Sequence, residues 1–340
     1  MTGPVVVGID GIELGSVERE RLGHPLVGMV ILFARNFESP EQLTRLTAEI
    51  HALRDPPLLI AVDHEGGRVQ RFRSGFTRLP AMRRLGELWE RDVLLACRTA
   101  ASLGYVLAAE LRAHGVDLSF TPVLDLDWGR SEVIGDRALH SDPRVVAMLA
   151  AHICHGLSMA GMANCGKHFP GHGWAVADSH VAVPQDPRSR DEILRLDAAP
   201  YRWLGPQLAG VMPAHVIYEG VDSMPAGFSS RWIRILRRDC GFAGAVFTDD
   251  LLMEGARTQG SVPERAAAGL AAGCDLVLVC SDPAAMDAVL ANLAWRAGKS
   301  FHERYQRLRP RGPAMAMSDL SRSELWRRAG ADIAPLGVTV

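Results

Sequence analysis

Short apolar runs recur along the chain, and the stretches between them have apolar residues spaced as on one face of a helix. Most of the runs are rich in β-branched residues and apolar at every position, which is typical of strands buried on both faces of a parallel sheet. Eight such runs favour a closed (β/α)8 barrel (TIM barrel) of the α/β class over an open doubly wound sheet. The predicted strands span residues 5–9, 29–33, 58–62, 118–121, 162–168, 210–213, 245–248 and 276–279.

Capping residues mark the starts of several predicted helices. Ser39 precedes Pro40, and Asp142 precedes another proline, so each pair offers an N-cap oxygen followed by a proline at the first helical position. No GxGxxG follows the first strand and no GxxxxGK[ST] occurs, so neither a dinucleotide-binding nor a P-loop fold is supported. The remaining predicted helices span residues 92–114, 142–160, 190–204, 229–239, 262–272 and 283–295.

The pattern changes after about residue 300, where the chain becomes polar, contains prolines and has only weak helical periodicity. Barrels of this type commonly occupy ~250 residues or more as one unit. We therefore predict a single domain, with the barrel over residues 1–300 and a short helical or irregular C-terminal appendage over residues 301–340.

Composition and charge exclude several classes of partner. The net charge is −2 and no basic stripe is evident, so we expect no nucleic-acid partner and no electrostatic attachment to a membrane. The N-terminus does not resemble a signal peptide, and no run of 18 or more apolar residues is evident, so we expect a cytoplasmic protein. No sequence pattern indicates the oligomeric state, and we expect a monomer. The six cysteines form no CxxC pair, as expected of free thiols in a reducing compartment, and are Cys97, Cys154, Cys165, Cys240, Cys274 and Cys280.

Ionisable residues follow five of the predicted strands. The carboxyl ends of barrel strands meet on the catalytic face, so we expect these residues to share one site. A single case could be a salt bridge or a loop contact, whereas five are hard to attribute to packing. They are Asp63, Glu65, Arg68 and Arg71 after the third strand, Asp136 and Arg137 after the fourth, Lys167 and His168 at the fifth, His215 after the sixth, and Asp249 and Asp250 at the seventh.

The loop after the fifth strand has the highest density of such residues. It reads KHFPGHGWAVADSH over residues 167–180 and contains three histidines, a lysine and an aspartate. Gly171 and Gly173 allow unusual backbone angles in it. Loops of this kind carry function when a rigid scaffold presents them.

These stretches resemble glycoside hydrolase family 3, specifically its bacterial β-N-acetylglucosaminidases of peptidoglycan recycling. The resemblance runs from about Gly8 to about Ser281. It rests on ILFARNFESPEQL, AVDHEGGRVQRF, FTPVLDLD, IGDRAL, KHFPGHGWAVADSH, MPAHVIY, PAGFSS and VFTDDLLMEGA, in this order. It implies a retaining, exo-acting β-N-acetylhexosaminidase with a TIM barrel, no cofactor and no metal. The implied substrate is a small carbohydrate or muropeptide, GlcNAc β-1,4-linked to 1,6-anhydro-N-acetylmuramic acid, in a recycling process that serves cell-wall biogenesis, cell shape and division.

Retention requires a nucleophile on one face of the sugar and an acid/base beside the leaving oxygen. The resemblance implies Asp249 as the nucleophile, with Asp250 as a rival that is expected to be structural. It implies His180 as the acid/base, oriented by Asp178. Histidine, with an ordinary pKa near 6.5, can protonate a leaving group and later deprotonate water near neutral pH, and a neighbouring aspartate raises that pKa.

The resemblance also implies which residues surround the sugar at the cleavage site. A carboxylate accepts hydrogen bonds from hydroxyls, whereas arginine and lysine only donate, so a mixture of the two suits a neutral polyol better than a phosphate. His215 and Met253 are expected to border the pocket, Glu65 to be structural, and His172 to be either scaffolding or catalytic support. The implied sugar-binding residues are Asp63, Arg71, Arg137, Lys167 and His168.

Other functions stay open at this point. A metal-dependent barrel hydrolase is one, although the first strand offers no HxH pair and no HExxH occurs. Its ligands would come from His168, His172, His180, Asp63 and Asp249. A sugar-binding barrel without activity is the second, and phosphorolysis in place of hydrolysis is a third.

Overall fold

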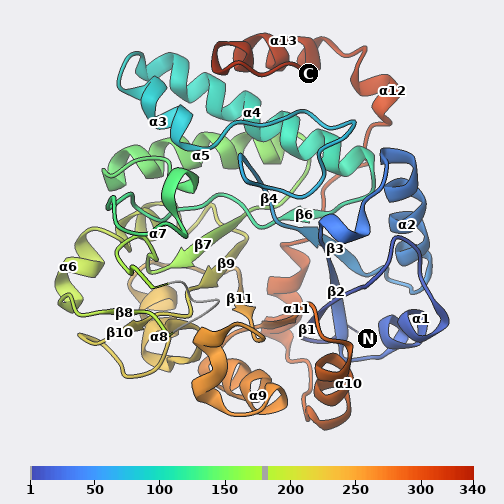
Figure 1. Cartoon of the computed structure of the whole chain (residues 1–340), viewed down its shortest axis with the longest axis vertical. Coiled ribbons are helices and arrows are strands. Elements are labelled where there is room, and N and C mark those ends of the chain that lie inside the picture. The colour runs from blue at the N-terminus through green and yellow to red at the C-terminus, as the bar shows by residue number, and fades with distance from the viewer. Residues whose placement is uncertain (1, 178–182) are drawn as a thin grey trace.

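Eight parallel strands surround the centre of the molecule in the computed structural model, which describes residues 2–177 and 183–340 (Figure 1). Strands adjacent in the sheet follow one another along the chain, and β12 returns to pair with β1. Bridges from Leu118 to Ala163 and from Val123 to Lys167 close the ring between β6 and β7. The predicted (β/α)8 barrel is therefore confirmed. Its strands are β1 (Val5–Gly8), β2 (Val27–Leu32), β3 (Leu59–Val62), β6 (Leu118–Ser119), β7 (Cys165–Phe169), β9 (Gly210–Pro213), β11 (Ala245–Asp250) and β12 (Leu276–Val279).

Most barrel strands divide their side chains between two hydrophobic cores. In β1, Val6 joins the core inside the barrel, whereas Val5 and Val7 join the core between the barrel and its helices. Successive side chains of a strand point to opposite faces, so a strand with apolar packing on both sides must be apolar at every position. This is the physical reason for the continuous apolar runs in the sequence.

Helices cover the outside of the barrel and mostly follow the predicted segments. The helix predicted from Ser39 begins at Pro40, and Ser39 Oγ caps it by accepting from the Gln42 backbone N–H at 3.2 Å. The bounds are α1 (Ser16–Gly23), α2 (Pro40–Ala52), α3 (Arg83–Trp89), α4 (Val93–Ala113), α5 (Pro143–Met159), α6 (Arg190–Arg195), α7 (Ala199–Leu204), α8 (Ser230–Arg238), α9 (Val262–Ala272) and α10 (Pro283–Asn292). Short strands outside the barrel are β4 (His64–Gly66), β5 (Val69–Gln70), β8 (Gln185–Asp186) and β10 (Ile217–Tyr218).

The single helix predicted over residues 190–204 was wrong, because the chain forms two short helices there, α6 and α7. Pro200 would have stood inside the longer helix, where it lacks an N–H and clashes with the carbonyl four residues earlier. In the structure it lies in the first turn of α7, where prolines are tolerated. The break also allows Asp197 to turn inward, where its carboxylate accepts from Arg188 Nη1 at 2.7 Å.

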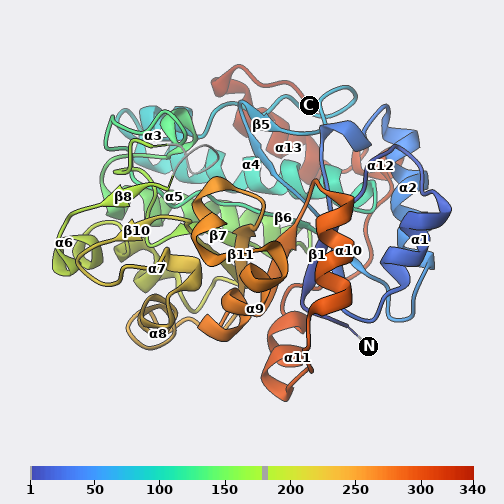
Figure 2. The same ribbon diagram turned by 60° about the horizontal axis from the view of Figure 1, so that its bottom comes forward.

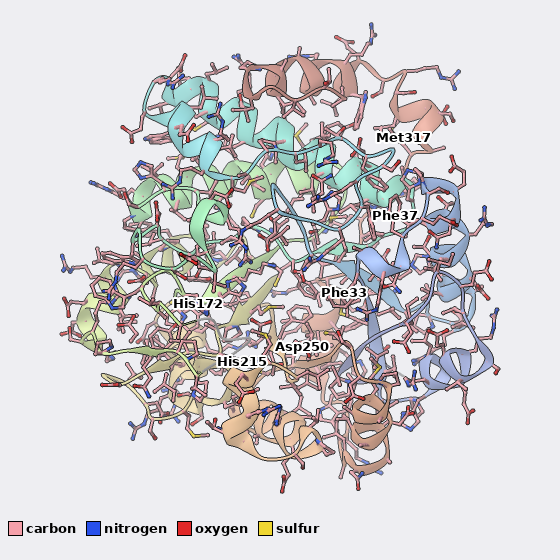
Figure 3. All side chains as sticks on the ribbon, viewed as in Figure 1. Phe33, Phe37, His172, His215, Asp250 and Met317 are labelled. Atoms are coloured by element: carbon pink, nitrogen blue, oxygen red, sulfur yellow. The ribbon has the colours of Figure 1, made fainter. Side chains whose placement is uncertain are left out.

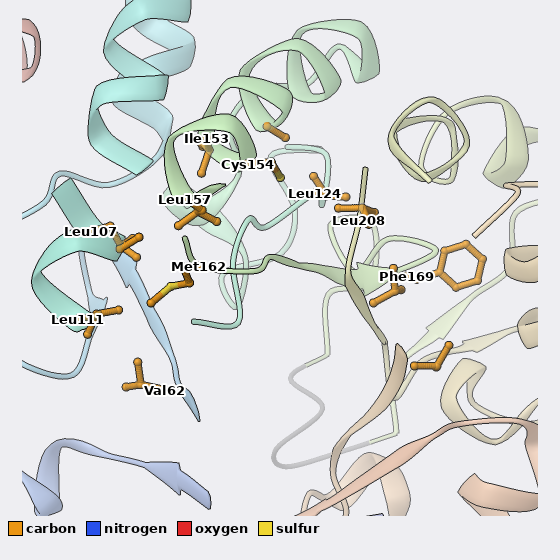
Figure 4. Packing of buried hydrophobic residues seen from close by; sticks show 14 of the residues in the cluster. Val62, Leu107, Leu111, Leu124, Ile153, Cys154, Leu157, Met162, Phe169 and Leu208 are labelled. Carbon is orange, nitrogen blue, oxygen red and sulfur yellow. The ribbon is translucent and has the colours of Figure 1, made fainter. Parts of the chain in front are cut away.

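Helices α4 and α5 pack closely against each other and against the barrel. By length and composition alone α4 could cross a membrane, but 67% of its apolar window is buried inside the protein, so it is a core helix. Glycine permits the close approach, because a Cβ on Gly156 would lie 2.0 Å from the Ala101 carbonyl oxygen. Figure 4 shows side chains of both helices directed toward the barrel, among them Leu107, Leu111, Ile153 and Leu157, with Val62 of β3 opposite Leu111.

The chain after residue 298 forms α11 (Lys299–Gln306), α12 (Met317–Leu320) and α13 (Glu324–Ile333). Phe301, Tyr305 and Leu308 complete the inner core at the amino ends of the strands, where the Tyr305 hydroxyl donates to the Gly28 carbonyl at 2.7 Å. Figure 2 shows α11 at the lower end of the molecule, below the ring of strands. Helix α13 packs instead on α4, where Asp332 accepts hydrogen bonds from α4 side chains. The first of these helices thus closes the barrel floor, and the last covers an outer helix.

The glycine contact between α4 and α5 leads to a prediction about stability. Gly156→Ala alone would favour helix formation by ~1 kcal/mol, but overpacking against a backbone carbonyl costs ~1–3 kcal/mol. We expect the overlap to dominate and the free energy of unfolding in urea to fall by roughly 1–2 kcal/mol. Met148→Ala, at a position 47% exposed on the same helix, is the control and should change it by less than ~0.5 kcal/mol. A Gly156→Ala protein as stable as the parent would contradict the close contact.

Candidate active site

A cavity of about 900 Å3 opens at the carboxyl ends of the barrel strands. Figure 3 shows three of its lining residues, Phe33, His172 and Asp250, around the centre of the molecule. All five predicted sugar-binding residues and the predicted nucleophile line this cavity: Asp63, Arg71, Arg137, Lys167, His168 and Asp249. Asp178 and His180, predicted as the catalytic pair, lie outside the described residues.

The barrel strands carry these side chains from the core to the cavity. In β11 the residues before Asp249 are buried, while Asp249 and Asp250 are partly exposed. Strand β3 is wholly buried and is followed at once by the partly exposed Asp63. A strand buried in both cores is held firmly, so the side chains at its carboxyl end are presented on a rigid frame.

The ammonium group of Lys167 joins two carboxylates at the base of the cavity. Its Nζ lies 2.6 Å from Asp63 Oδ1 and 2.6 Å from Glu65 Oε1. Burial would lower the pKa of Lys167, but the two carboxylates outweigh it and raise the pKa above its ordinary value. The lysine therefore stays charged. It holds Oδ1 of Asp63, while Oδ2 of Asp63 faces Arg71.

Glu65 accepts from the guanidinium of Arg137 through both carboxylate oxygens, at 2.9 and 2.8 Å. Its side chain is only 2% exposed. Burial opposes ionisation, yet Arg137 and Lys167 hold the pKa of Glu65 far below its ordinary value. Glu65 was expected to be structural, and in the structure it positions two of the cations that line the cavity, Arg137 and Lys167.

Arg71 reaches the cavity from the loop after β5. Its Nη2 lies 3.8 Å from Asp63 Oδ2, and its guanidinium carbon lies 5.9 Å from the ring centre of Phe33. Its buried Nε makes no hydrogen bond within the described residues. An acceptor, Asp63 Oδ2, thus lies next to the N–H donors of Arg71. A sugar hydroxyl both donates and accepts, so this pair suits its recognition.

The two adjacent aspartates at the end of β11 have opposite electrostatic environments. Burial would raise the pKa of Asp249, but His168, His215 and the Asp250 backbone N–H, which donates to its Oδ1 at 2.8 Å, hold that pKa below its ordinary value. Burial together with the charge of Asp249 raises the pKa of Asp250 to about 6, although the Leu252 backbone N–H donates to it. Asp249 therefore stays ionised to a lower pH than Asp250, and it is ionised near neutral pH.

Asp125 was not predicted from the sequence, although it organises the loop after β7. It is fully buried, and its Oδ2 accepts from His168 Nδ1 at 2.7 Å. Its Oδ1 accepts from the backbone N–H of His172 at 2.7 Å. These two contacts fix the orientation of the His168 ring and the start of the loop that follows β7. The only signal was the first of the two aspartates in FTPVLDLD, and nothing in the sequence connects it to a loop more than 40 residues away.

The two further residues expected to border the pocket occupy different positions. Met253 lines the cavity. His215 is fully buried behind it, stacked on Phe228 with ring centres 5.2 Å apart, and its Nε2 lies 3.2 Å from the Asp250 carbonyl oxygen. The expectation for His215 was wrong in position, because its ring packs against apolar neighbours under the end of β11 instead of facing the cavity.

Glycines allow the loop after β7 to lie close to its neighbours. A Cβ on Gly173 would come within 1.9 Å of the Leu126 carbonyl oxygen, and one on Gly171 within 2.7 Å of the Asp197 side chain. Close approach of the chain is therefore the reason for glycine at both positions. Among the described residues, no group of three or more His, Cys, Asp or Glu side chains is arranged to hold a metal ion.

Known families and proteins match nearly the whole chain. Residues 6–308 match the model of the glycosyl hydrolase family 3 N terminal domain. A β-hexosaminidase of Bordetella avium is 63% identical over 296 residues, which cover 86% of this chain and 85% of that protein. A β-hexosaminidase of Aromatoleum aromaticum is 57% identical over 337 residues, covering 98% and 95% of the two chains.

Solved structures match at similar coverage. Native NagZ from Neisseria gonorrhoeae superposes with a TM-score of 0.93 at 48% sequence identity, over 98% of both chains. The same protein in complex with N-trifluoroacetyl-D-glucosamine gives a TM-score of 0.93 at 49% identity, again over 98% of each chain.

Proposed function

The chain belongs to glycosyl hydrolase family 3 and is a β-N-acetylhexosaminidase, and on this premise we propose that it removes terminal GlcNAc from 1,6-anhydro-N-acetylmuramic acid and its stem-peptide derivatives, with retention of configuration. The observation that carries the proposal is the ionised Asp249 at the end of β11, in a cavity that also presents Asp63, Lys167 and Arg71. A related structure holds N-trifluoroacetyl-D-glucosamine, an N-acylated glucosamine of the proposed class.

In the proposed reaction, Asp249 attacks the anomeric carbon and forms a covalent glycosyl-enzyme, which water then hydrolyses. A nucleophile must be ionised before it can attack, and the lowered pKa of Asp249 meets this condition near neutral pH. Asp249 is held on a barrel strand, and its Oδ1 accepts from the Asp250 N–H. Within residues 2–177 and 183–340 its Oδ2 accepts no hydrogen bond, and this is the oxygen that attacks in the proposal. Asp250 remains the structural neighbour, with its carboxyl engaged by the Leu252 N–H.

Recognition of the sugar falls to the charged cluster at the base of the cavity. Asp63 accepts from hydroxyls of GlcNAc, while Lys167 and Arg71 donate to hydroxyl oxygens. Arg137 donates to Glu65 through two of its nitrogens and so holds Glu65 in place. In the proposal, its other N–H groups donate to the sugar. Charged partners strengthen such hydrogen bonds relative to neutral ones.

The proposal assigns the proton transfers to His180, with Asp178 orienting its ring. His180 protonates the leaving oxygen in the first step, and in the second it takes a proton from the attacking water. This assignment rests on the family resemblance of KHFPGHGWAVADSH and on the ordinary pKa of histidine. His172 then supports the loop from below, where its backbone N–H is bonded to Asp125.

We place this activity in the cytoplasm, in a monomeric protein that serves cell-wall recycling and thereby cell shape and division. Free cysteines throughout the chain support a reducing compartment. The small net negative charge supports a carbohydrate substrate in preference to nucleic acid or a membrane surface. Cell fractionation and size-exclusion chromatography of the native protein test both assignments, and a periplasmic or dimeric protein would contradict them.

The first test is hydrolysis of the p-nitrophenyl glycosides of β-GlcNAc and β-glucose, with EDTA present throughout. We expect release of p-nitrophenol from the GlcNAc glycoside and at least about a hundredfold less from the glucoside, because only the former carries the acetamido group. Activity that disappears with EDTA and returns with a divalent metal would support the metal-dependent alternative. Turnover that requires added phosphate would show phosphorolysis.

Asp249→Asn should lower kcat on p-nitrophenyl β-GlcNAc by about a thousandfold or more, because the neutral amide is a poor nucleophile. Asp250→Asn is the matched control and should retain most activity, since an amide oxygen can still accept from the Leu252 N–H. Circular dichroism establishes that both variants are folded. The opposite result, an active Asp249→Asn and an inactive Asp250→Asn, would exchange the two roles.

His180→Ala should lower kcat/KM by about 100–10,000-fold on a disaccharide, whose leaving alcohol needs a proton, and much less on an aryl glycoside with a good leaving group. The comparison of the two substrates separates acid catalysis from a general disturbance of the site. Equal losses on both would show that His180 is not the acid/base.

A further inference from the structure

The outer part of the cavity differs in character from its base. The base is lined by buried or partly buried residues that engage one another, whereas the rim is lined by exposed ones, among them Arg68, Arg130, Glu132 and Val176. A volume of about 900 Å3 is near the upper end of the ~300–1,000 Å3 that ligand pockets usually have. The rim therefore has room for the group attached to the sugar that the base binds.

Arg130 differs from the other arginine of the rim. Arg68 donates to the Glu132 and Val133 carbonyls and lies 3.6 Å from an Asp136 carboxylate oxygen, so its guanidinium is occupied. Arg130 forms no hydrogen bond or ion pair with any side chain within residues 2–177 and 183–340. Its guanidinium carbon lies 4.3 Å from the ring centre of Trp174. The edge of the guanidinium, which carries its donors, is left unused by this contact.

Trp174 is itself held in place by a network of buried charges. The guanidinium of Arg188 lies 4.4 Å from the ring centre of Trp174 and 4.8 Å from that of Trp128. Arg188 is 8% exposed and is paired with Asp186 at 2.6 Å and with Asp197 at 2.7 Å. A side chain stacked on a fixed ring loses little further freedom on binding, so Arg130 is a pre-organised cation.

We propose that Arg130 binds a carboxylate of the leaving group and so makes the enzyme selective for anionic aglycones. Guanidinium groups bind carboxylates through two parallel hydrogen bonds, and no side chain in the described part of the chain occupies the donors of Arg130. The inference rests on the proposed function, in which the leaving sugar is a muramic acid derivative and therefore carries a lactyl carboxylate. Arg130 acts on specificity through the aglycone and has no part in the bond-breaking steps at Asp249.

The test compares two disaccharides that differ in this charge and in one methyl group. One is GlcNAc β-1,4-linked to 1,6-anhydro-N-acetylmuramic acid, and the other is its lactyl methyl ester. The readout is the ratio of kcat/KM for the acid to kcat/KM for the ester, followed through release of the second sugar. We expect the parent enzyme to prefer the acid by about tenfold, the effect of one charge-assisted contact at a partly exposed site. Added salt should reduce the preference, because it screens exposed charges.

Arg130→Ala should bring this ratio to about one, mainly by lowering kcat/KM for the acid. Arg130→Lys should give an intermediate ratio, because it keeps the charge and loses the planar stacking face and the paired donors. Arg234→Ala removes the same charge from an exposed position on α8 that does not line the cavity, and it should keep the ratio of the parent. This control separates a local contact from a change in overall charge.

The outcomes distinguish this inference from the function on which it rests. A parent enzyme that cleaves acid and ester equally well, or an Arg130→Ala enzyme that keeps the preference of the parent, overturns the role of Arg130 and leaves the hydrolase intact. A parent enzyme that cleaves p-nitrophenyl β-GlcNAc but neither disaccharide overturns the proposed substrate, and the role of Arg130 with it. Loss of the preference in Arg130→Ala alone supports both.

Discussion

The buried ammonium of Lys167, placed between Asp63 and Glu65, organises the base of the cavity. Lys167 belongs to β7, whereas Asp63 and Glu65 come from the segment that follows β3. Glu65 also pairs with Arg137, which extends the cluster. A buried charge without a partner is costly, so each member requires the others. The cluster therefore sets the position of Asp63, with its Oδ1 at Lys167 and its Oδ2 facing Arg71. The sugar-binding groups are in this way fixed by electrostatics among themselves before any ligand arrives.

A second consequence of burial is the different ionisation of the two aspartates that end β11. They are adjacent in the sequence, yet burial and neighbouring charges lower the pKa of Asp249 and raise that of Asp250 to about 6. The charge of Asp249 raises the pKa of its neighbour, whereas His168 and His215 lower the pKa of Asp249 itself. Two residues of the same type thus acquire different chemistry from their surroundings.

The loop after β7 and the rim of the cavity depend on two further networks of buried polar groups. Asp125 orders the loop after β7 through His168 and His172, while Arg188 and its two carboxylates hold the aromatic residues beside Arg130. The polar groups of both networks are buried and paired, which gives a loop the rigidity that it would otherwise lack. The base of the cavity and its rim are thus supported by different parts of the chain.

The sequence by itself determined the barrel, the side of the barrel that carries the site, and the lining residues Asp63, Arg71, Arg137, Lys167, His168 and Asp249, because strand periodicity and the residues at strand ends are local properties of the chain. It did not separate α6 from α7, although Pro200 offered a signal. It also misplaced His215, whose ring packs beneath β11. Only the tertiary structure decided the pairing of Asp125 with His168, the opposite pKa shifts at β11 and the seat of Arg130 on Trp174. Each of these depends on burial and on contacts between segments far apart in the chain, which no local pattern records.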